Sequence, residues 1–362
     1  MPFDLIAPAS AESAKLRRDR RQVSTWLFTV CGMLMVMISL GGATRLTGSG
    51  LSIMEWAPLS GALPPLSQTE WERLYGLYQQ IPQSQLVNAG IGLGGFKHIF
   101  WLEWAHRLWG RLIGVVFLLP LLAFWWRGAI RRGLWLRLAG LFVLGGLQGA
   151  VGWFMVASGF FEGSTAVSAY RLVIHLVLAL TLYSAILWTA LSIRSPAKVQ
   201  PRTGLQVMVA SCCALVGLTI VAGGFVAGLH AGLTYNTYPL MDGRLVPAGY
   251  SALSPWAKNL TENIAAVQFD HRLIATLTAL IVTGTAIAGL RSRASAVRGA
   301  AAALGVLVLV QYALGVTTLL WVVPVALGTA HQAVAVLLLT AALTTLYFAR
   351  RAPEAAPSRS LG

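Results

Sequence analysis

The chain has 362 residues, of which 56% are hydrophobic and only 11% are charged. An ordinary soluble domain carries about 25% charged residues, so this composition excludes a water-soluble fold. The formal net charge is +15, and the placement of the basic residues decides whether this charge serves nucleic acid or a membrane surface.

Eight apolar runs are long enough to cross a hydrocarbon core, which needs about 20 residues of helix. In chain order, the predicted spans are Ser24–Ala43, Glu103–Trp126, Leu136–Val156, Ala169–Ile193, Leu205–Ala227, Phe269–Leu290, Ala301–Leu320 and Leu327–Phe348. In the long connection between the first two spans, Ser67 to Gln80 predicts a short amphipathic helix at the membrane interface, because Trp71, Leu74 and Tyr78 share one face.

Basic residues gather on one side of these spans. Of the 27 Lys and Arg residues, 18 lie in the two tails and the even-numbered connections, and the positive-inside rule makes that side cytoplasmic. Both termini are then cytoplasmic, as an even number of spans requires. We therefore expect a multi-pass protein of the cell inner membrane that binds no nucleic acid.

Motifs of the first half recur in the second half, in the same order. The recurring elements are Gly41-Gly42 as Gly223-Gly224, His106-Arg107 as His271-Arg272, Gln148 with Gly152 as Gln311 with Gly315, and His175 as His331. Four spans in each half give both halves the same orientation, related by an axis along the membrane normal. The predicted fold class is an all-α membrane protein with eight transmembrane helices in two pseudo-twofold-related four-helix bundles.

The predicted organisation follows from the spans and the repeat. Residues 1–22 form a cytoplasmic tail, 23–194 the first half with external loop 44–102, 195–203 a cytoplasmic linker, 204–349 the second half with external loop 228–268, and 350–362 a second cytoplasmic tail.

Four of the six histidines lie inside predicted spans, all within about two turns of the external face. Ionisable residues in a span are costly and usually mark a functional site. Two imidazoles from facing helices can hold a haem iron, so His106 with His175 and His271 with His331 are candidate metal ligands. The alternative is that each histidine only hydrogen-bonds a neighbouring helix.

Glu103 stands three residues before His106, so both side chains share one helical face. Its counterpart in the second half is Gln268, which cannot exchange a proton. This asymmetry indicates one reactive site, with Glu103 as its catalytic candidate, and one site that transfers electrons or supports structure. The alternative is a glutamate at the interface, wetted by the external loop.

Four arginines lie near the external ends of the predicted spans: Arg45, Arg107, Arg171 and Arg272. Guanidinium groups suit bidentate binding of carboxylates, so we assign these residues to the anionic propionates of a haem. Snorkelling of the side chains to the interface is the alternative.

Four segments resemble the haem A synthases of the proteobacterial and mitochondrial type. They are GGATRLTGSGLSIMEWAPLSGALPP from residue 41, FKHIFWLEWAHRLWGR from residue 96, NTYPLMDG from residue 236 and FDHR from residue 269. The first external loop has no cysteine, unlike that of some related bacterial enzymes.

The resemblance implies an oxidoreductase that converts haem O to haem A by oxidising a ring methyl group to a formyl group, with the oxygen derived from water. It implies that His106 and His175 hold the substrate haem in the first half. It implies that His271 and His331 hold a haem b cofactor in the second half, and that Glu103 assists catalysis.

The resemblance also implies a set of partners. Haem O synthase, cytochrome oxidase assembly factors and an external electron acceptor such as a quinone are expected, in a setting of membrane lipid, and a homo-oligomer is compatible with the sequence. Two other function classes stay open at this point. One is a di-haem b cytochrome that moves electrons without modifying haem, and the other is a transporter whose histidines relay protons.

Overall fold

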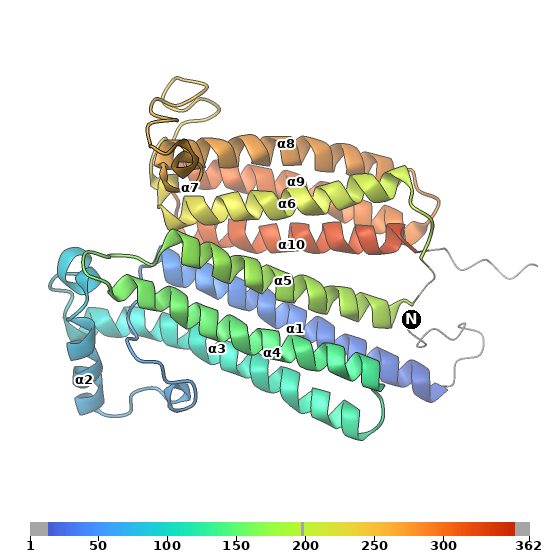
Figure 1. Ribbon diagram of the computed structural model, residues 1–362, viewed down its shortest axis with the longest axis horizontal. Helices are drawn as coiled ribbons and strands as arrows, with labels where there is room; N and C mark the ends of the chain where they lie inside the picture. The colour runs from blue at the N-terminus through green and yellow to red at the C-terminus, as the bar shows by residue number, and fades with distance from the viewer. Residues whose placement is uncertain (1–13, 197–198, 352–362) are drawn as a thin grey trace, which may run out of the picture.

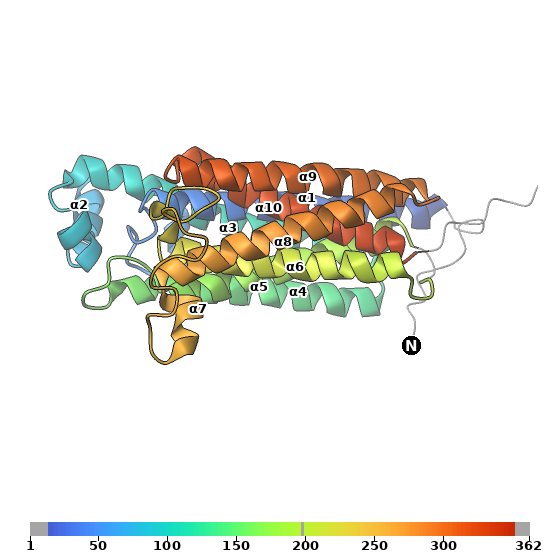
Figure 2. The ribbon, with the colours of Figure 1, turned by 90° about the horizontal axis from the view of Figure 1, so that it is seen from above.

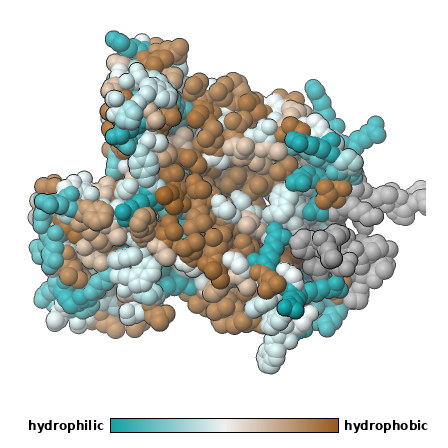
Figure 3. All heavy atoms as spheres, in the orientation of Figure 1, coloured by the Kyte–Doolittle hydropathy of each residue, from teal (hydrophilic) through white to brown (hydrophobic). Residues whose placement is uncertain are grey.

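The computed structural model describes residues 14–196 and 199–351. Parts of the predicted tails and linker, residues 1–13, 197–198 and 352–362, lie outside this description. Within the described residues, eight helices are long and apolar enough to cross a membrane, which confirms the predicted number of spans and the all-α class. Figure 3 shows hydrophobic residues over the middle of the helices and hydrophilic ones toward both ends.

The eight long helices keep the predicted order but are mostly longer than the predicted spans. They are α1 (Ala14–Leu46), α3 (Gly92–Trp126), α4 (Arg132–Val156), α5 (Ala169–Arg194), α6 (Gly204–Gly228), α8 (Ile264–Leu290), α9 (Ser295–Leu320) and α10 (Val325–Ala349). The shorter elements are η2 (Ser60–Ala62), α2 (Gln68–Tyr78), η3 (Gln83–Val87), η4 (Ala157–Phe160), η5 (Ala231–Leu233), η6 (Trp256–Lys258) and α7 (Asn259–Glu262).

The long helices pack as two groups of four, one from each half of the chain (Figures 1 and 2). In the first group α1 contacts α3 and α5, and α4 contacts both of these; in the second, α8 contacts α6 and α9, and α10 contacts both of these. The two groups meet through α1 against α10 and through α5 against α6 and α10. A pseudo-twofold axis between the groups stays a prediction.

The largest apolar core of the described residues lies in the end of the bundle where α1 begins and α10 ends. It includes Leu27 and Val30 of α1, Leu121 of α3, Ile186 of α5 and Tyr347 of α10, all nearly inaccessible. Between helices in lipid, close packing rather than removal from water supplies the stability. The opposite end, where the long loops connect, contains the four histidines of the spans.

The predicted interfacial helix exists as α2, and Ser67 caps it by accepting a hydrogen bond from the Glu70 N–H. Its apolar face packs on protein rather than on lipid, since Trp71 lies against Phe96 and Phe100 of α3. This packing explains why α3 begins at Gly92 instead of Glu103. At 1.5 Å per residue, α3 is about 50 Å long and projects beyond a 30 Å hydrocarbon core.

Candidate functional site

The four histidines of the spans lie two in each group of helices. His106 on α3 is close enough to His175 on α5 for the two rings to interact electrostatically. His271 on α8 interacts in the same way with His331 on α10. The structure thus brings together the two pairs predicted from the repeat. The other two histidines, His98 and His230, are exposed and belong to neither pair.

In the first half, each imidazole packs against a glycine of a neighbouring helix. A Cβ atom added to Gly41 of α1 would lie 3.2 Å from His106 Nε2. One added to Gly152 of α4 would lie 2.9 Å from His175 Cε1. Distances this short are rare between real side chains, so glycine is what lets each ring approach the next helix.

The second half repeats this contact at the matching glycines. A Cβ atom on Gly223 of α6 would lie 3.0 Å from His271 Cε1, and one on Gly315 of α9 would lie 2.9 Å from His331 Cε1. The glycines that recur along the sequence are therefore those that contact the histidines. Their recurrence is explained by the space that an imidazole needs.

Two glutamines lie one turn before the glycines of α4 and α9. Gln148 Nε2 lies 3.1 Å from His175 Nδ1 and donates to the His175 carbonyl at 3.0 Å. Gln311 Nε2 lies 3.5 Å from His331 Nε2. Within the described part of the chain, Nδ1 of both His271 and His331 is buried without a hydrogen-bond partner.

These observations fit a haem in each half better than a compact metal site. Among residues 14–196 and 199–351, no three His, Cys, Asp or Glu side chains gather closely enough to hold an ion. Paired imidazoles are, however, a usual ligand set for haem iron.

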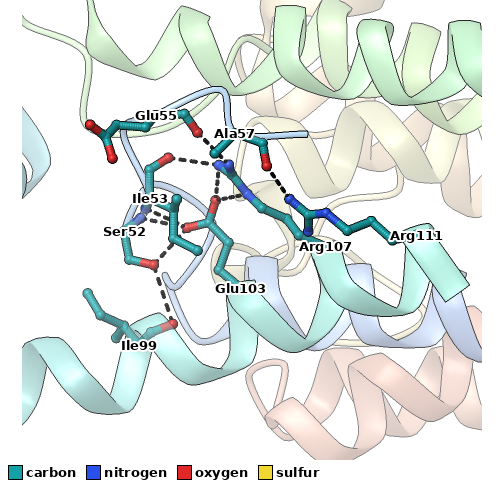
Figure 4. Close-up of polar contacts among 8 residues, drawn as sticks. All are labelled: Ser52, Ile53, Glu55, Ala57, Ile99, Glu103, Arg107 and Arg111. Carbon is teal, nitrogen blue, oxygen red and sulfur yellow. Dashed lines mark hydrogen bonds and ion pairs between the residues drawn. The ribbon is translucent and has the colours of Figure 1, made fainter. Parts of the chain in front are cut away.

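Glu103 on α3 binds the long loop between α1 and α3 to the helix, in an arrangement that we call the first latch (Figure 4). Its buried carboxylate accepts hydrogen bonds through Oε2 from the Ser52 N–H and hydroxyl, both at 2.7 Å, and from the Ile53 N–H at 3.0 Å. Through Oε1 it pairs with Arg107 at 2.6 Å. Arg107 also donates to the carbonyls of Ile53 and Glu55.

Gln268 on α8 does the same for the long loop between α6 and α8, and we call this arrangement the second latch. Arg272 donates to Gln268 Oε1 at 2.9 Å and to the carbonyls of Tyr235 and Thr237. The Gln268 amide donates to two loop carbonyls, one of them that of Thr234 at 2.7 Å. The first latch therefore accepts loop N–H groups, whereas the second donates to loop C=O groups.

The two latches extend the internal repeat into the loops. Ile53 and Tyr235 accept from the matching arginines and lie 182 positions apart, the same spacing as Gly41 and Gly223. The chain therefore keeps one register from each glycine pair to the latch that follows it. Because the bonds to the arginines use backbone oxygens, side-chain identity along the loops does not reveal this register.

The arginines assigned to propionates differ in the bonds they already make. Arg45 donates to the Ala227 carbonyl, and within the described residues Nε of both Arg45 and Arg272 is buried without a partner. Arg171 donates to the Phe154 carbonyl at 2.8 Å and lies 3.8 Å above the ring of the same residue. Arg107 is committed to the first latch.

Two residues that form the site were not predicted from the sequence. Ser52 is buried and binds the Glu103 carboxylate. Arg111, one helical turn beyond Arg107, donates to the carbonyls of Ala57 and Pro58 at 2.6 and 2.8 Å. The signal that could have found Ser52 is its spacing of 182 from Thr234, a second small hydroxyl residue.

Comparisons with known proteins agree on one family. The profile of the cytochrome oxidase assembly protein family matches residues 24–343. The chain is 62% identical to a haem A synthase of Granulibacter bethesdensis, over 94% of this chain and 90% of the relative. It is 49% identical to one of Rhodospirillum centenum, over 91% and 89%, and 46% identical to one of Nitrosospira multiformis, over 92% and 94%.

Proposed function

The chain belongs to the cytochrome oxidase assembly protein family, among its haem A synthases, and from this premise we propose how its residues serve the reaction. It is a multi-pass membrane oxidoreductase that converts haem O to haem A. The finer chemistry proposed is oxidation of a ring methyl group to a formyl group, with oxygen taken from water. The observation that carries the assignment of residues is that each half holds two buried histidines within electrostatic range of each other.

We assign His106 and His175 to the iron of the substrate, haem O, and His271 and His331 to the iron of a haem b cofactor. The glycine behind each ring supports this assignment, because it gives every imidazole room in the interior of its four-helix group. When bound, haem b would supply a one-electron acceptor.

Glu103 is the proposed catalytic group, because it is the carboxylate nearest in sequence to a substrate ligand and has only an amide as its counterpart. Ser52 and Arg107 hold its carboxylate in place. A carboxylate held in this way can stabilise positive charge that develops on a nearby reacting group, or accept its proton. Arg45 and Arg272, each with a free buried Nε–H, are the best placed to bind propionates, and Arg107 and Arg171 are secondary candidates.

The orientation and partners follow from the same premise. We propose that the chain lies in the inner membrane with both termini in the cytoplasm, because its basic residues favour that side. Haem O synthase would supply the substrate and assembly factors would receive the product. The electrons would leave to an external acceptor such as a quinone.

The test is haem analysis in cells that make haem O but lack their own haem A synthase. Expression of this chain should produce haem A, separable from haem O by chromatography of extracted haem. Glu103→Ala should abolish the conversion, whereas Gln268→Ala should retain a large part of it. Unchanged haem O in the presence of folded wild-type protein would instead favour a di-haem cytochrome, and full activity of Glu103→Ala would remove the role of Glu103.

A further inference from the structure

The first external loop contains an uncharged apolar segment, Trp56 to Leu66, that we call the strap. Three of its leucines project from the protein surface, with Leu59 87% exposed, Leu63 71% and Leu66 83%. From Trp56 to Ser67 the sequence has no charged residue. Exposed apolar side chains gathered in this way usually mark a surface that contacts another apolar phase.

Arg111 holds the strap against the side of α3. Its guanidinium donates to the carbonyls of Ala57 and Pro58, and a Cβ atom on Gly61 would lie 2.9 Å from Arg111 Nη2. Arg111 lies one turn further from the loop end of α3 than Arg107. The strap thus follows α3 toward the middle of the bundle instead of rising away from it.

The position of Arg111 along the bundle follows from a contact between α3 and α1. Trp109, two residues before it, donates to the Met33 carbonyl at 2.9 Å, and Met33 lies about 20 Å along α1 from the end of that helix at Leu46. An arginine at this depth is costly in lipid unless acceptors satisfy it. The carbonyls of Ala57 and Pro58 provide acceptors, and the guanidinium in turn satisfies these two strap carbonyls.

The outer end of the strap is fixed to other parts of the protein. Trp56 packs edge-on against Trp153 of α4, with ring centroids 5.3 Å apart. Glu55, directly before the strap, forms an ion pair with Arg73 of α2 at 2.8 Å. The leucines beyond Trp56 are more exposed than Trp56 itself, which is 47% exposed.

The second external loop takes a different course at the matching place. Thr276 stands on α8 where Arg111 stands on α3, and it hydrogen-bonds the Tyr312 hydroxyl of α9 instead of a loop carbonyl. Beyond this point the second loop contains Asp242 and Arg244, whose charges require water. The strap is thus a feature of the first half alone.

We propose that the strap is inserted into the bilayer, with Leu59 and Leu63 in contact with the acyl chains of the leaflet nearest the long loops. Three observations carry this placement: the strap has no charge, its leucines are exposed beside a membrane-spanning helix, and Arg111 on the side of that helix satisfies two of its carbonyls. The membrane thereby meets the protein directly beside α3, the helix that carries His106 and Glu103.

The test is the accessibility of nitroxide spin labels in the protein reconstituted into phosphatidylcholine vesicles. Labels are attached at Leu59→Cys and at Leu63→Cys, in a background in which Cys31, Cys212 and Cys213 are replaced by alanine. The matched control is Leu245→Cys, because Leu245 is 74% exposed and follows Arg244 in the second loop. Collision with oxygen, which concentrates in lipid, is compared with collision with a water-soluble nickel chelate.

Labels on the strap should collide with oxygen and be shielded from nickel, whereas the label at residue 245 should show the reverse. Frequent nickel collisions at residues 59 and 63 would overturn the proposal, since the strap would then lie in water. Labels shielded from both reagents would also overturn it, because a second protein copy would then cover the strap. Adding Arg111→Gln should raise nickel collisions at residue 59, and no change would overturn the anchoring role of Arg111.

Discussion

The two latches hold equivalent loops with opposite hydrogen-bond polarity. In the first half the Glu103 carboxylate accepts from the N–H groups of Ser52 and Ile53, and in the second the Gln268 amide donates to loop carbonyls. The arginine four residues later binds two loop carbonyls in both cases. The repeated frame thus keeps its backbone register, while the latch residue itself is charged in the first half and neutral in the second.

The difference also reaches the loops beyond the latches. The first loop continues as the strap, held by Arg111 on α3, whereas the second places Tyr238 against Tyr312 of α9, with the hydroxyl oxygens 2.6 Å apart. The first half is therefore bounded by an apolar segment at its side, and the second by a polar contact between a loop and a helix. This difference is compatible with the proposed division into a half that admits the substrate and a half that retains a cofactor.

Exchanging the two latch residues should have the largest effect, because it mismatches the hydrogen-bond donors and acceptors of each latch. Glu103→Gln leaves Arg107 without its buried negative partner and sets an amide N–H against loop N–H groups. Loss of one partner from a buried ion pair costs about 3–5 kcal/mol, so we expect hydrogen exchange of residues 49–57 to rise strongly. Gln268→Glu should loosen the second loop instead, because a carboxylate would face carbonyls. Unchanged exchange in both variants would contradict opposite polarity.

Removing the hydroxyl groups of Ser52 and Thr234, which lie at matching positions, should have a smaller effect that differs between the two latches. Ser52→Ala removes a hydrogen bond to a charged group, worth about 1.5–3 kcal/mol, and should lower the free energy of unfolding in detergent. Thr234→Ala should cost less, because the Thr234 hydroxyl bonds only the nearby Ala231 carbonyl and takes no part in the second latch. Equal losses for both variants would show that Ser52 is no more than a local contact.

Adding a methyl group at the glycines that contact the histidines should have a similar effect in both halves. Gly152→Ala and Gly315→Ala each place a methyl group 2.9 Å from an imidazole, and overpacking of this kind costs about 1–3 kcal/mol. We expect haem content, measured as the pyridine haemochrome, to fall in both. Gly149→Ala is the control, because no atom of the described chain outside the local helix backbone lies within 4 Å of its added Cβ. A normal haem content in all three variants would contradict the role of the glycines.

The smallest effect is expected at Glu55, where the strap begins. The hydrogen bonds from Arg73 lower the pKa of Glu55 below its usual value, so this pair stabilises the fold above the unfolded-state pKa and loses that effect as pH falls through the lowered one. Both side chains are nearly half exposed, so the pair contributes at most about 1 kcal/mol. Glu55→Gln should slightly lower stability at neutral pH and flatten its decline in acid, as followed by thermal unfolding. If the stability of the variant fell in acid as much as that of the wild type, the decline would belong to other groups.

The number of spans could be predicted because each must present about 20 apolar residues to lipid. The start of α3 could not, because Phe96 and Phe100 extend the helix by packing on α2, and hydropathy does not register a contact between distant segments. The capped helix α2 was predicted correctly, but not which surface its apolar face would meet.

The histidine pairs could be predicted because the repeat places them in matching helices. The latches could not, since their loop partners are mostly backbone atoms that leave no pattern in the sequence. Glu103 was noticed as an asymmetry, yet its bonds to Ser52 and Ile53 depend on a loop that returns to the helix from about 50 residues away. The importance of Arg111 was hidden for the same reason.

The central claim, a haem-binding histidine pair in each half, is tested most directly by the visible spectrum and pyridine haemochrome of the purified protein. The wild type should show a Soret band, His271→Ala should lose the haem b contribution, and His106→Ala should lose haem O or haem A while keeping haem b. A colourless protein, or a haem content that neither substitution changes, would contradict the claim.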